Sequence, residues 1–355
     1  MLFKVDQGGF FLIKEMSYVI YKSLVINTVL NILLLPLSIL LLIFKRKKSF
    51  ILMYHLVCQE LNYDSLNKGI VISKTTFLRQ IKLLRWLGFL FIGPSDIRIK
   101  NGVLMTFDDG YAETYREIKD IVKYEHIPAL FFLCPRFFIE GEQRFWWNEL
   151  EKIQRSQSYD PILFMDILQQ YIEHVNLPFS LIQKKRFFFQ HIRSIFLKLK
   201  LSKVYEVLDA YYAESGVDFK DEHSLFMSKR DINEANKIGF EWGAHTYSHI
   251  SIAAESCAHI EEEIIKSDTE IERIVDYKPD SFAYPFGVES NDSNIVNLIR
   301  SKYKYIYTTR YGFVDNKTNL YAIPRISISE ADGTLGFINK ISGAYLFLYK
   351  IFDGR

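Results

Sequence analysis

Cysteine is scarce in this sequence, and the few cysteines present do not form a recognisable site. Cys58, Cys134 and Cys257 lie far apart, are odd in number and contain no CxxC pair. This arrangement argues against a thiolate zinc site and against a fold held together by disulfides. It favours a reducing compartment.

The chain also lacks an excess of charge of either sign. Its 44 lysine and arginine residues are almost balanced by 42 aspartate and glutamate residues, so the formal net charge is +2. No basic field favours a nucleic acid as partner, and no RNA- or DNA-binding motif is present. Charged residues make up 24% of the 355 positions, and no internal repeat is visible. We therefore expect an ordered chain with one large domain.

One stretch near the N-terminus lacks charge altogether. Leu24–Phe44 comprises 21 residues without an ionisable side chain, and a helix of that length measures about 30 Å, enough to cross a bilayer core. Two asparagines and Pro36 interrupt it, so a buried or interfacial helix is the alternative. The basic run Lys45–Lys48 follows directly and favours the cytoplasmic side for the rest of the chain. We predict an N-terminal segment, 1–49, with a membrane helix that anchors a cytoplasmic domain.

The remaining sequence alternates between short apolar runs and stretches with helical periodicity. The apolar runs predict about seven strands, at 50–54, 103–107, 129–133, 240–244, 281–284, 305–308 and 322–323. Helices are predicted between them, at 75–87, 114–124, near 234, at 258–275 and at 293–301. Strands and helices that alternate at this spacing build parallel βα units. We therefore predict an α/β fold, a distorted (β/α) barrel, over 50–355.

A segment from about 141 to 224 does not follow this alternation. It reads as helices rich in Phe, Leu, Ile and Lys, without strand-like runs. We predict a helical insertion in one barrel loop, serving substrate recognition, membrane contact or structural cover. The apolar stretch Leu335–Phe352 fits either a helix at a membrane interface or one that covers the barrel.

Two segments that follow predicted strands carry side chains suited to a metal. Asp108 and Asp109 come directly after Phe107, and adjacent side chains point in different directions, so one carboxylate can bind a metal while the other faces a substrate. A turn or capping pair is the alternative. His245 and His249 share one face if their segment turns helically. Together with Asp109 they form a two-histidine, one-carboxylate set that leaves room for water and substrate on a divalent metal.

These segments resemble three motifs of the polysaccharide deacetylase family, also called the NodB-homology or family 4 carbohydrate esterase group. TFDDGY at Thr106–Tyr111 resembles the first motif, and HTYSH at His245–His249 resembles the second. AYPFG at Ala283–Gly287 is similar to the third, although taken alone it would be a strand followed by a Pro-Gly turn. The short runs at 53–55 and 324–326 also occur in members that act on surface glycans.

The resemblance covers roughly 50–329, without the insertion, and implies metal-assisted hydrolysis of an N-acetyl group on a sugar. Asp109, His245 and His249 would hold the metal, with zinc favoured and cobalt, nickel or iron as alternatives. Asp108 would be the general base. The backbone N–H of Tyr111 would help to stabilise the oxyanion.

The chain departs from the family pattern in two places. Many members carry an arginine in the third motif that orients the base, whereas this chain has Ala283 and Tyr284 there. Arg325 is the candidate replacement, and Tyr284 a candidate substrate contact. Many members also carry a late Leu-x-His that supplies the acid, and this motif is missing. His55, at the end of the first predicted strand, is the candidate acid, with a structural hydrogen bond as the alternative.

The function predicted from these features is a membrane-anchored N-deacetylase for a glycan or a lipid-linked sugar in surface polysaccharide metabolism. A deformylase or other amide hydrolase for a lipid-linked sugar is one alternative. A catalytically inactive glycan-binding protein of a polysaccharide assembly system is another. Retention of both aspartates and both histidines argues against the inactive form, because a binding module does not need them.

Overall fold

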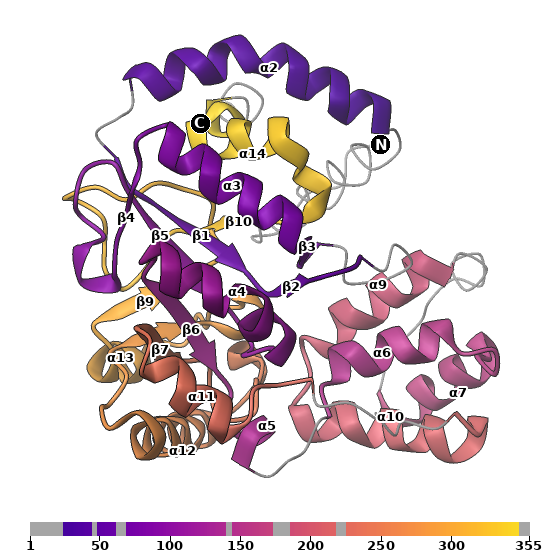
Figure 1. The fold of residues 1–355 in the computed structure, drawn as a ribbon. Coiled ribbons are helices and arrows are strands. Elements are labelled where there is room, and N and C mark those ends of the chain that lie inside the picture. Colours follow the sequence, from indigo (N-terminus) through magenta and orange to yellow (C-terminus); the bar gives the residue numbers. More distant parts are fainter. Residues whose placement is uncertain are drawn as a thin grey trace. The chain divides into compact units, whose positions relative to one another are not determined.

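The computed structural model describes residues 24–44, 48–61, 69–139, 144–172, 185–217 and 225–347 (Figure 1). These residues divide into two compact units. The larger unit runs from Lys48 to Ala331, and the smaller one combines the residues on either side of it.

A parallel sheet that curls into a half-barrel forms the centre of the larger unit (Figure 1). Its strands, in spatial order, are β10 (Ile326–Ser327), β1 (Phe50–Tyr54), β5 (Gly102–Phe107), β6 (Ala129–Leu133), β7 (Phe240–Ala244), β8 (Ser281–Ala283) and β9 (Tyr305–Tyr307). The short β4 (Leu90–Phe91) also pairs with β5, while β2 (Leu56–Cys58) and β3 (Val71–Ser73) form a separate pair.

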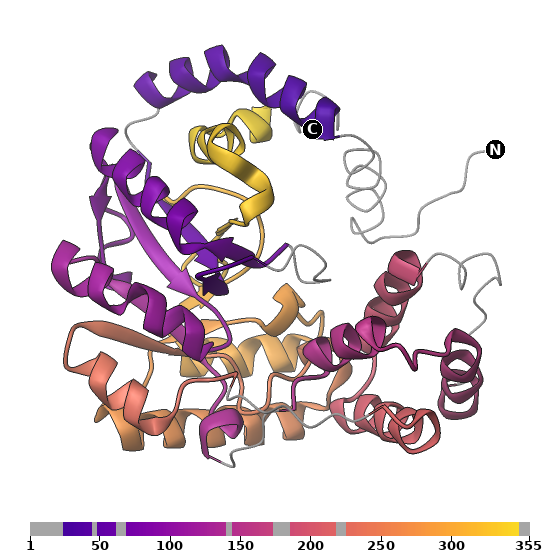
Figure 2. The same ribbon diagram turned by 45° about the vertical axis from the view of Figure 1, so that its right-hand side comes forward.

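The strands are nearly continuous apolar runs because both faces of the sheet are covered. Every residue of β1, β5 and β6 is buried, as expected for parallel strands between two layers. The concave face is filled by side chains from successive strands, among them Ile51, Leu104, Phe132 and Tyr307. The helices that alternate with these strands are α3 (Lys74–Trp86), α4 (Ala112–Glu125), α11 (Lys229–Asn236), α12 (Cys257–Val275) and α13 (Ser293–Lys302). Figure 2 shows helices of this set outside the curled sheet.

The predicted order of parallel strands and helices is confirmed, with one displaced strand. The last strand was predicted at Ala322–Ile323, but β10 comprises Ile326–Ser327. Ile323 makes only an isolated parallel bridge, to Tyr307 of β9. The next residue, Pro324, has no N–H to donate, which interrupts the ladder. The chain then crosses to β1, where Ile326 pairs with Leu52.

The segment predicted as a helical insertion contains four longer helices in its described residues. They are α6 (Trp146–Arg155), α7 (Pro161–Tyr171), α9 (Lys185–Phe196) and α10 (Leu201–Ser215), preceded by the short α5 (Arg136–Ile139). Their shared core is aromatic, with Phe164 packing against Phe188, Phe189 and Tyr211. Residues 141–143, 173–184 and 218–224 of the predicted insertion lie outside the described residues.

The smaller unit contains α2 (Leu24–Phe44) and α14 (Gly333–Ser342). The helix predicted over Leu24–Phe44 forms with those bounds. Contrary to the membrane-helix prediction, no helix within the described ranges is long and apolar enough to cross a membrane. Residues 332–347, which the sequence analysis included in the barrel domain, group with α2 instead. Residues 45–47 of the basic run and 348–352 of the apolar C-terminal stretch lie outside the described residues.

Candidate metal centre

Asp108 and Asp109 lie at the carboxyl end of β5, where the backbone turns sharply. Asp109 and Gly110 both have φ of +74°, a left-handed conformation that is uncommon for aspartate. The turn directs the two carboxylates to different neighbours. Both side chains are buried, with 3% and 5% of their surface exposed.

His245 and His249 lie in the loop after β7, at the same edge of the sheet. The loop does not form the helical turn considered from the sequence, because Thr246 and His249 have φ of +61° and +58°. This backbone still brings the two imidazole rings to 4.7 Å between centroids. His245 Nδ1 lies 2.7 Å from the carbonyl oxygen of Ala283 in β8, so Nδ1 carries the proton and Nε2 is left with its lone pair.

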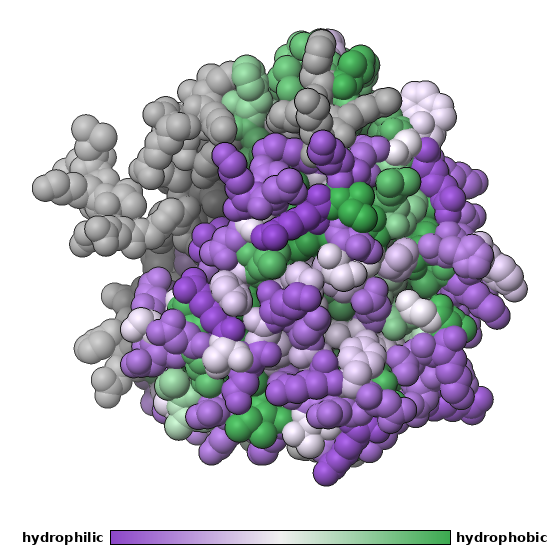
Figure 3. Space-filling model, turned by 90° about the vertical axis from the view of Figure 1, so that its left-hand side faces the viewer, coloured by the Kyte–Doolittle hydropathy of each residue, from purple (hydrophilic) through white to green (hydrophobic). Residues whose placement is uncertain are grey.

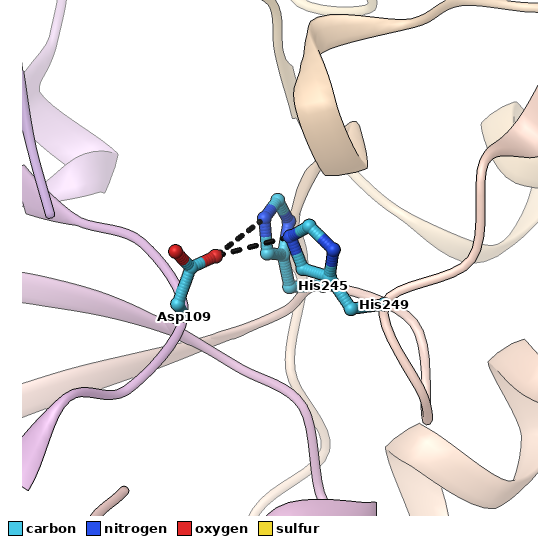
Figure 4. A group of neighbouring side chains, drawn as sticks. All are labelled: Asp109, His245 and His249. Carbon is cyan, nitrogen blue, oxygen red and sulfur yellow. Dashed lines mark ion pairs between the residues drawn. The ribbon is translucent and has the colours of Figure 1, made fainter. Parts of the chain in front are cut away.

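The two histidines and Asp109 converge, as predicted, and form the candidate metal group (Figure 4). Asp109 Oδ1 lies 3.4 Å from His245 Nε2 and 3.0 Å from His249 Nε2. Among the described atoms, Asp109 Oδ1 accepts no hydrogen bond of acceptable geometry. Three buried ligand atoms that lie this close together fit a divalent cation.

The protonation states of the group also suit a metal. Burial raises the pKa of Asp109, but His249 and His245 outweigh it and hold the pKa well below the ordinary range. Burial lowers the pKa of His249 despite the nearby Asp109 carboxylate. An ionised carboxylate and neutral imidazoles are the forms that bind metal ions.

Asp108 is held by Arg325, a fully buried residue just before β10. The guanidinium donates to both carboxylate oxygens, with Nη1 to Oδ1 at 2.6 Å and Nη2 to Oδ2 at 2.8 Å. Its remaining donors reach Thr308 O at 3.1 Å and Thr106 Oγ1 at 3.3 Å. Burial raises the pKa of Asp108, but Arg325 and then His55 lower it below its ordinary value. The carboxylate is therefore ionised and fixed in orientation.

His55 lies on the other side of this carboxylate, directly after β1. Its Nε2 is 3.8 Å from Asp108 Oδ2, and 16% of its side chain is exposed. Within the described structure its Nδ1 has no hydrogen-bond partner. The His55 ring therefore lies beside Asp108, the residue that precedes the ligand Asp109.

The two predicted tyrosine contacts differ in their placement. Tyr111 begins α4 directly after the aspartate turn, and its ring stacks on Phe226. Tyr284 packs edge-on against Phe282 and is not brought to the metal group by any of its contacts. Burial raises the pKa of Tyr284 to about 12. The third-motif residue that does reach the site is Phe286, whose ring centroid lies 4.3 Å from that of His249.

Two further contributors were missed by the sequence analysis. Phe145, which precedes α6 of the insertion, packs edge-on against His249 at 4.8 Å and covers it together with Phe286. Glu263 of α12 accepts hydrogen bonds from Ser248 N at 2.8 Å and Ser248 Oγ at 2.7 Å. No local signal marks either residue, because phenylalanines fill the insertion and acidic residues are frequent along α12.

Comparisons with known proteins agree with this architecture. Residues 97–158 and 200–306 match the family model described as polysaccharide deacetylase. A search of curated proteins found no match.

Several solved structures have a similar fold. The deacetylase PplD of Streptococcus pyogenes, in complex with acetate, is 14% identical with a TM-score of 0.55, over 82% of this chain and 97% of that one. A de-N-acetylase from Aggregatibacter actinomycetemcomitans is 14% identical with a TM-score of 0.52, over 82% and 99%. IcaB from Ammonifex degensii is 16% identical with a TM-score of 0.50, over 84% and 97%. The chain therefore contains a polysaccharide deacetylase domain, matched over residues 97–158 and 200–306.

Proposed function

We propose that this deacetylase removes N-acetyl groups from a glycan or a lipid-linked sugar in a metal-dependent hydrolysis. The observation that carries the proposal is that the adjacent residues Asp108 and Asp109 have different partners. Asp109 completes a buried metal group with two histidines, while Asp108 is kept ionised by Arg325. One carboxylate is thereby committed to a cation and the other is available as a base.

Asp109, His245 and His249 would hold the metal, and their imidazole and carboxylate donors suit zinc best, with cobalt, nickel or iron as alternatives. When bound, such an ion polarises an amide carbonyl and lowers the pKa of water. His245 is held in the required tautomer by Ala283 O, and the loop that carries both histidines is fixed by Glu263.

The remaining steps belong to side chains and backbone around this group. Asp108 takes the proton of the attacking water, and Arg325 holds both of its oxygens during the transfer. The backbone N–H of Tyr111 donates to the developing oxyanion. His55, beside Asp108, gives a proton to the departing amine as the C–N bond breaks, so that acetate and a free amino sugar are released.

A matched pair of variants tests this assignment. Asp108→Asn should bind zinc like the wild type but lose turnover, because an amide cannot take the proton. His55→Ala should lower the rate by roughly two to four orders of magnitude. The measurement is acetate release from N-acetylated oligosaccharides by zinc-loaded protein, with bound metal quantified in each variant.

The outcomes separate the alternative functions. Full activity of Asp108→Asn would rule out the proposed base, and a near-normal rate of His55→Ala would rule out the proposed acid. Release of formate instead of acetate would identify a deformylase. Bound metal and bound glycan without release of either acid would identify an inactive glycan-binding protein.

We also propose that the catalytic unit acts on the cytoplasmic side of a membrane, where lipid-linked sugars are precursors. The support for this is the basic run Lys45–Lys48, because the cytoplasmic leaflet carries the anionic lipids that attract basic segments. A C-terminal phosphatase fusion that is active outside the cell would contradict it.

A further inference from the structure

Helix α2 presents its apolar side chains outwards. Six large apolar residues are between 48% and 70% exposed, namely Val29, Ile32, Leu33, Ile39, Leu40 and Ile43. They follow one another at intervals of three, one, six, one and three residues, which places them in a single stripe along the helix. Figure 3 shows hydrophobic side chains at the surface of this unit.

The side of α2 that faces α14 carries the polar residues Asn31 and Ser38 beside the buried Leu34. Ser38 Oγ donates to Asn339 Oδ1 at 2.6 Å, and Ser342 Oγ donates to Ser38 Oγ at 3.0 Å. Asn339 Nδ2 donates to Asn31 Oδ1 at 2.9 Å, and Tyr345 OH donates to the same oxygen. Ser38, Asn339 and Ser342 are at most 1% exposed.

An exposed apolar stripe opposite buried side-chain hydrogen bonds is uncommon in a helix pair folded in water. In water, an amphipathic helix buries its apolar stripe and exposes its polar face. In lipid, helices associate through small residues and hydrogen bonds between polar side chains, while apolar side chains face outwards. Gly336 of α14 lies at this contact, since a methyl group at its position would touch Asn31 Nδ2 at an ordinary 3.6 Å.

We propose that α2 and α14 form a pair of helices that lies in the interface of an anionic lipid bilayer, with the apolar stripe of α2 among the acyl chains. The 10 residues of α14 correspond to about 15 Å of helix, half of a bilayer core, which suits an interfacial position and not a crossing. In the sequence, Lys45, Arg46 and Lys47 follow the end of α2 and supply positive charge for anionic headgroups, whereas Lys48 pairs with Asp315 at 3.2 Å. The proposal is independent of the chemistry at the metal centre.

The test is flotation of the full-length protein with vesicles of phosphatidylcholine alone or mixed with phosphatidylglycerol. The stripe variant combines Leu33→Glu with Leu40→Glu. The control combines Trp86→Glu with Leu90→Glu, two apolar residues of the larger unit that are 81% and 56% exposed. We expect the wild type and the control to float with the anionic vesicles, less so at high salt, and the stripe variant to bind at least tenfold more weakly.

Equal binding of the stripe variant and the wild type would overturn the proposal, as would failure of the wild type to bind anionic vesicles. Light scattering without lipid examines the competing occupant, a second copy of the chain. A wild-type dimer that the stripe variant converts into a monomer would assign the stripe to that interface. Acetate release from a soluble oligosaccharide, measured in both variants, separates lost membrane contact from lost catalysis or folding.

Discussion

At the scale of single residues, the site is shaped by backbone conformations that a sequence does not announce. Asp109, Thr246, His249 and Phe286 all have φ between +56° and +74°, and all lie in the three loops around the metal group. Such conformations are uncommon for residues other than glycine and persist where surrounding contacts enforce them. The motifs in the sequence therefore indicated Asp109, His245 and His249 as candidate ligands, while the turns that make them converge could only be seen in the structure.

The sequence suggested that Arg325 orients the general base. In the structure its guanidinium holds both oxygens of Asp108, the proposed base. Arg325→Met removes the charge and both hydrogen bonds from the buried Asp108. We expect kcat to fall roughly ten- to a thousandfold, with metal content unchanged. The base must be ionised, so activity is lost as pH falls through the pKa of Asp108. Because Arg325 lowers that pKa, its removal moves the loss of activity to higher pH. A pH profile of kcat/KM measures this shift.

Two further variants control this experiment. Arg325→Lys should recover part of kcat, since an ammonium restores the charge but not the paired hydrogen bonds. Arg310→Met removes a surface arginine that pairs with Glu289 and should leave the profile unchanged. An unshifted acidic limb in Arg325→Met would show that Arg325 does not control the base.

At the scale of elements, what could be predicted depended on how local the signal is. Parallel strands covered on both faces are continuous apolar runs, so β1 and β6 were predicted with their observed bounds. The packing of Phe145 on His249 joins residues over 100 positions apart, and no local pattern encodes it. The link between α12 and the histidine loop spans only 15 positions, from Ser248 to Glu263, but no local pattern marks it either.

Helix α12 positions that loop through Glu263, which accepts two hydrogen bonds from Ser248. Glu263→Ala leaves the backbone N–H of Ser248 without this partner and loosens the segment between His245 and His249. We expect zinc affinity to fall about 10- to 100-fold, as for other residues that support metal ligands. Turnover at saturating zinc should change less. Calorimetric zinc titration and kcat at saturating metal measure the two effects.

Glu262→Ala is the matched control, because it removes the neighbouring carboxylate of α12 from an exposed position. It should bind zinc as the wild type does. Equal affinities of the two variants would exclude a positioning role for Glu263.

At the scale of the whole molecule, the larger unit was predictable and the smaller one was not. The two helices of the smaller unit are about 300 residues apart in the sequence, as the contact of Ser38 with Asn339 shows. Hydropathy alone identified Leu24–Phe44 as apolar, but it did not reveal that Asn31 and Ser38 of this helix face α14. A pattern of hydrophobicity gives the extent of a helix, whereas the direction of each face depends on its partner.

Metal binding should stabilise the larger unit, because its ligands come from loops after β5 and β7, two strands separated by β6. A cation that binds the folded chain at a hundred times its Kd contributes about 2.7 kcal/mol. For a unit of this size we expect the unfolding temperature to rise by about 5 °C when zinc is added to chelator-treated protein. Differential scanning calorimetry measures the rise.

Two variants show whether the stabilisation comes from this site. His249→Ala removes one ligand and should abolish the zinc-dependent rise. His191→Ala should keep it, because that exposed histidine of α9 is not part of the metal group. A rise of the same size in His249→Ala would place the zinc elsewhere on the protein. Since chain folding and metal binding are coupled through these loops, the rise should be lost on re-addition of chelator and return with zinc.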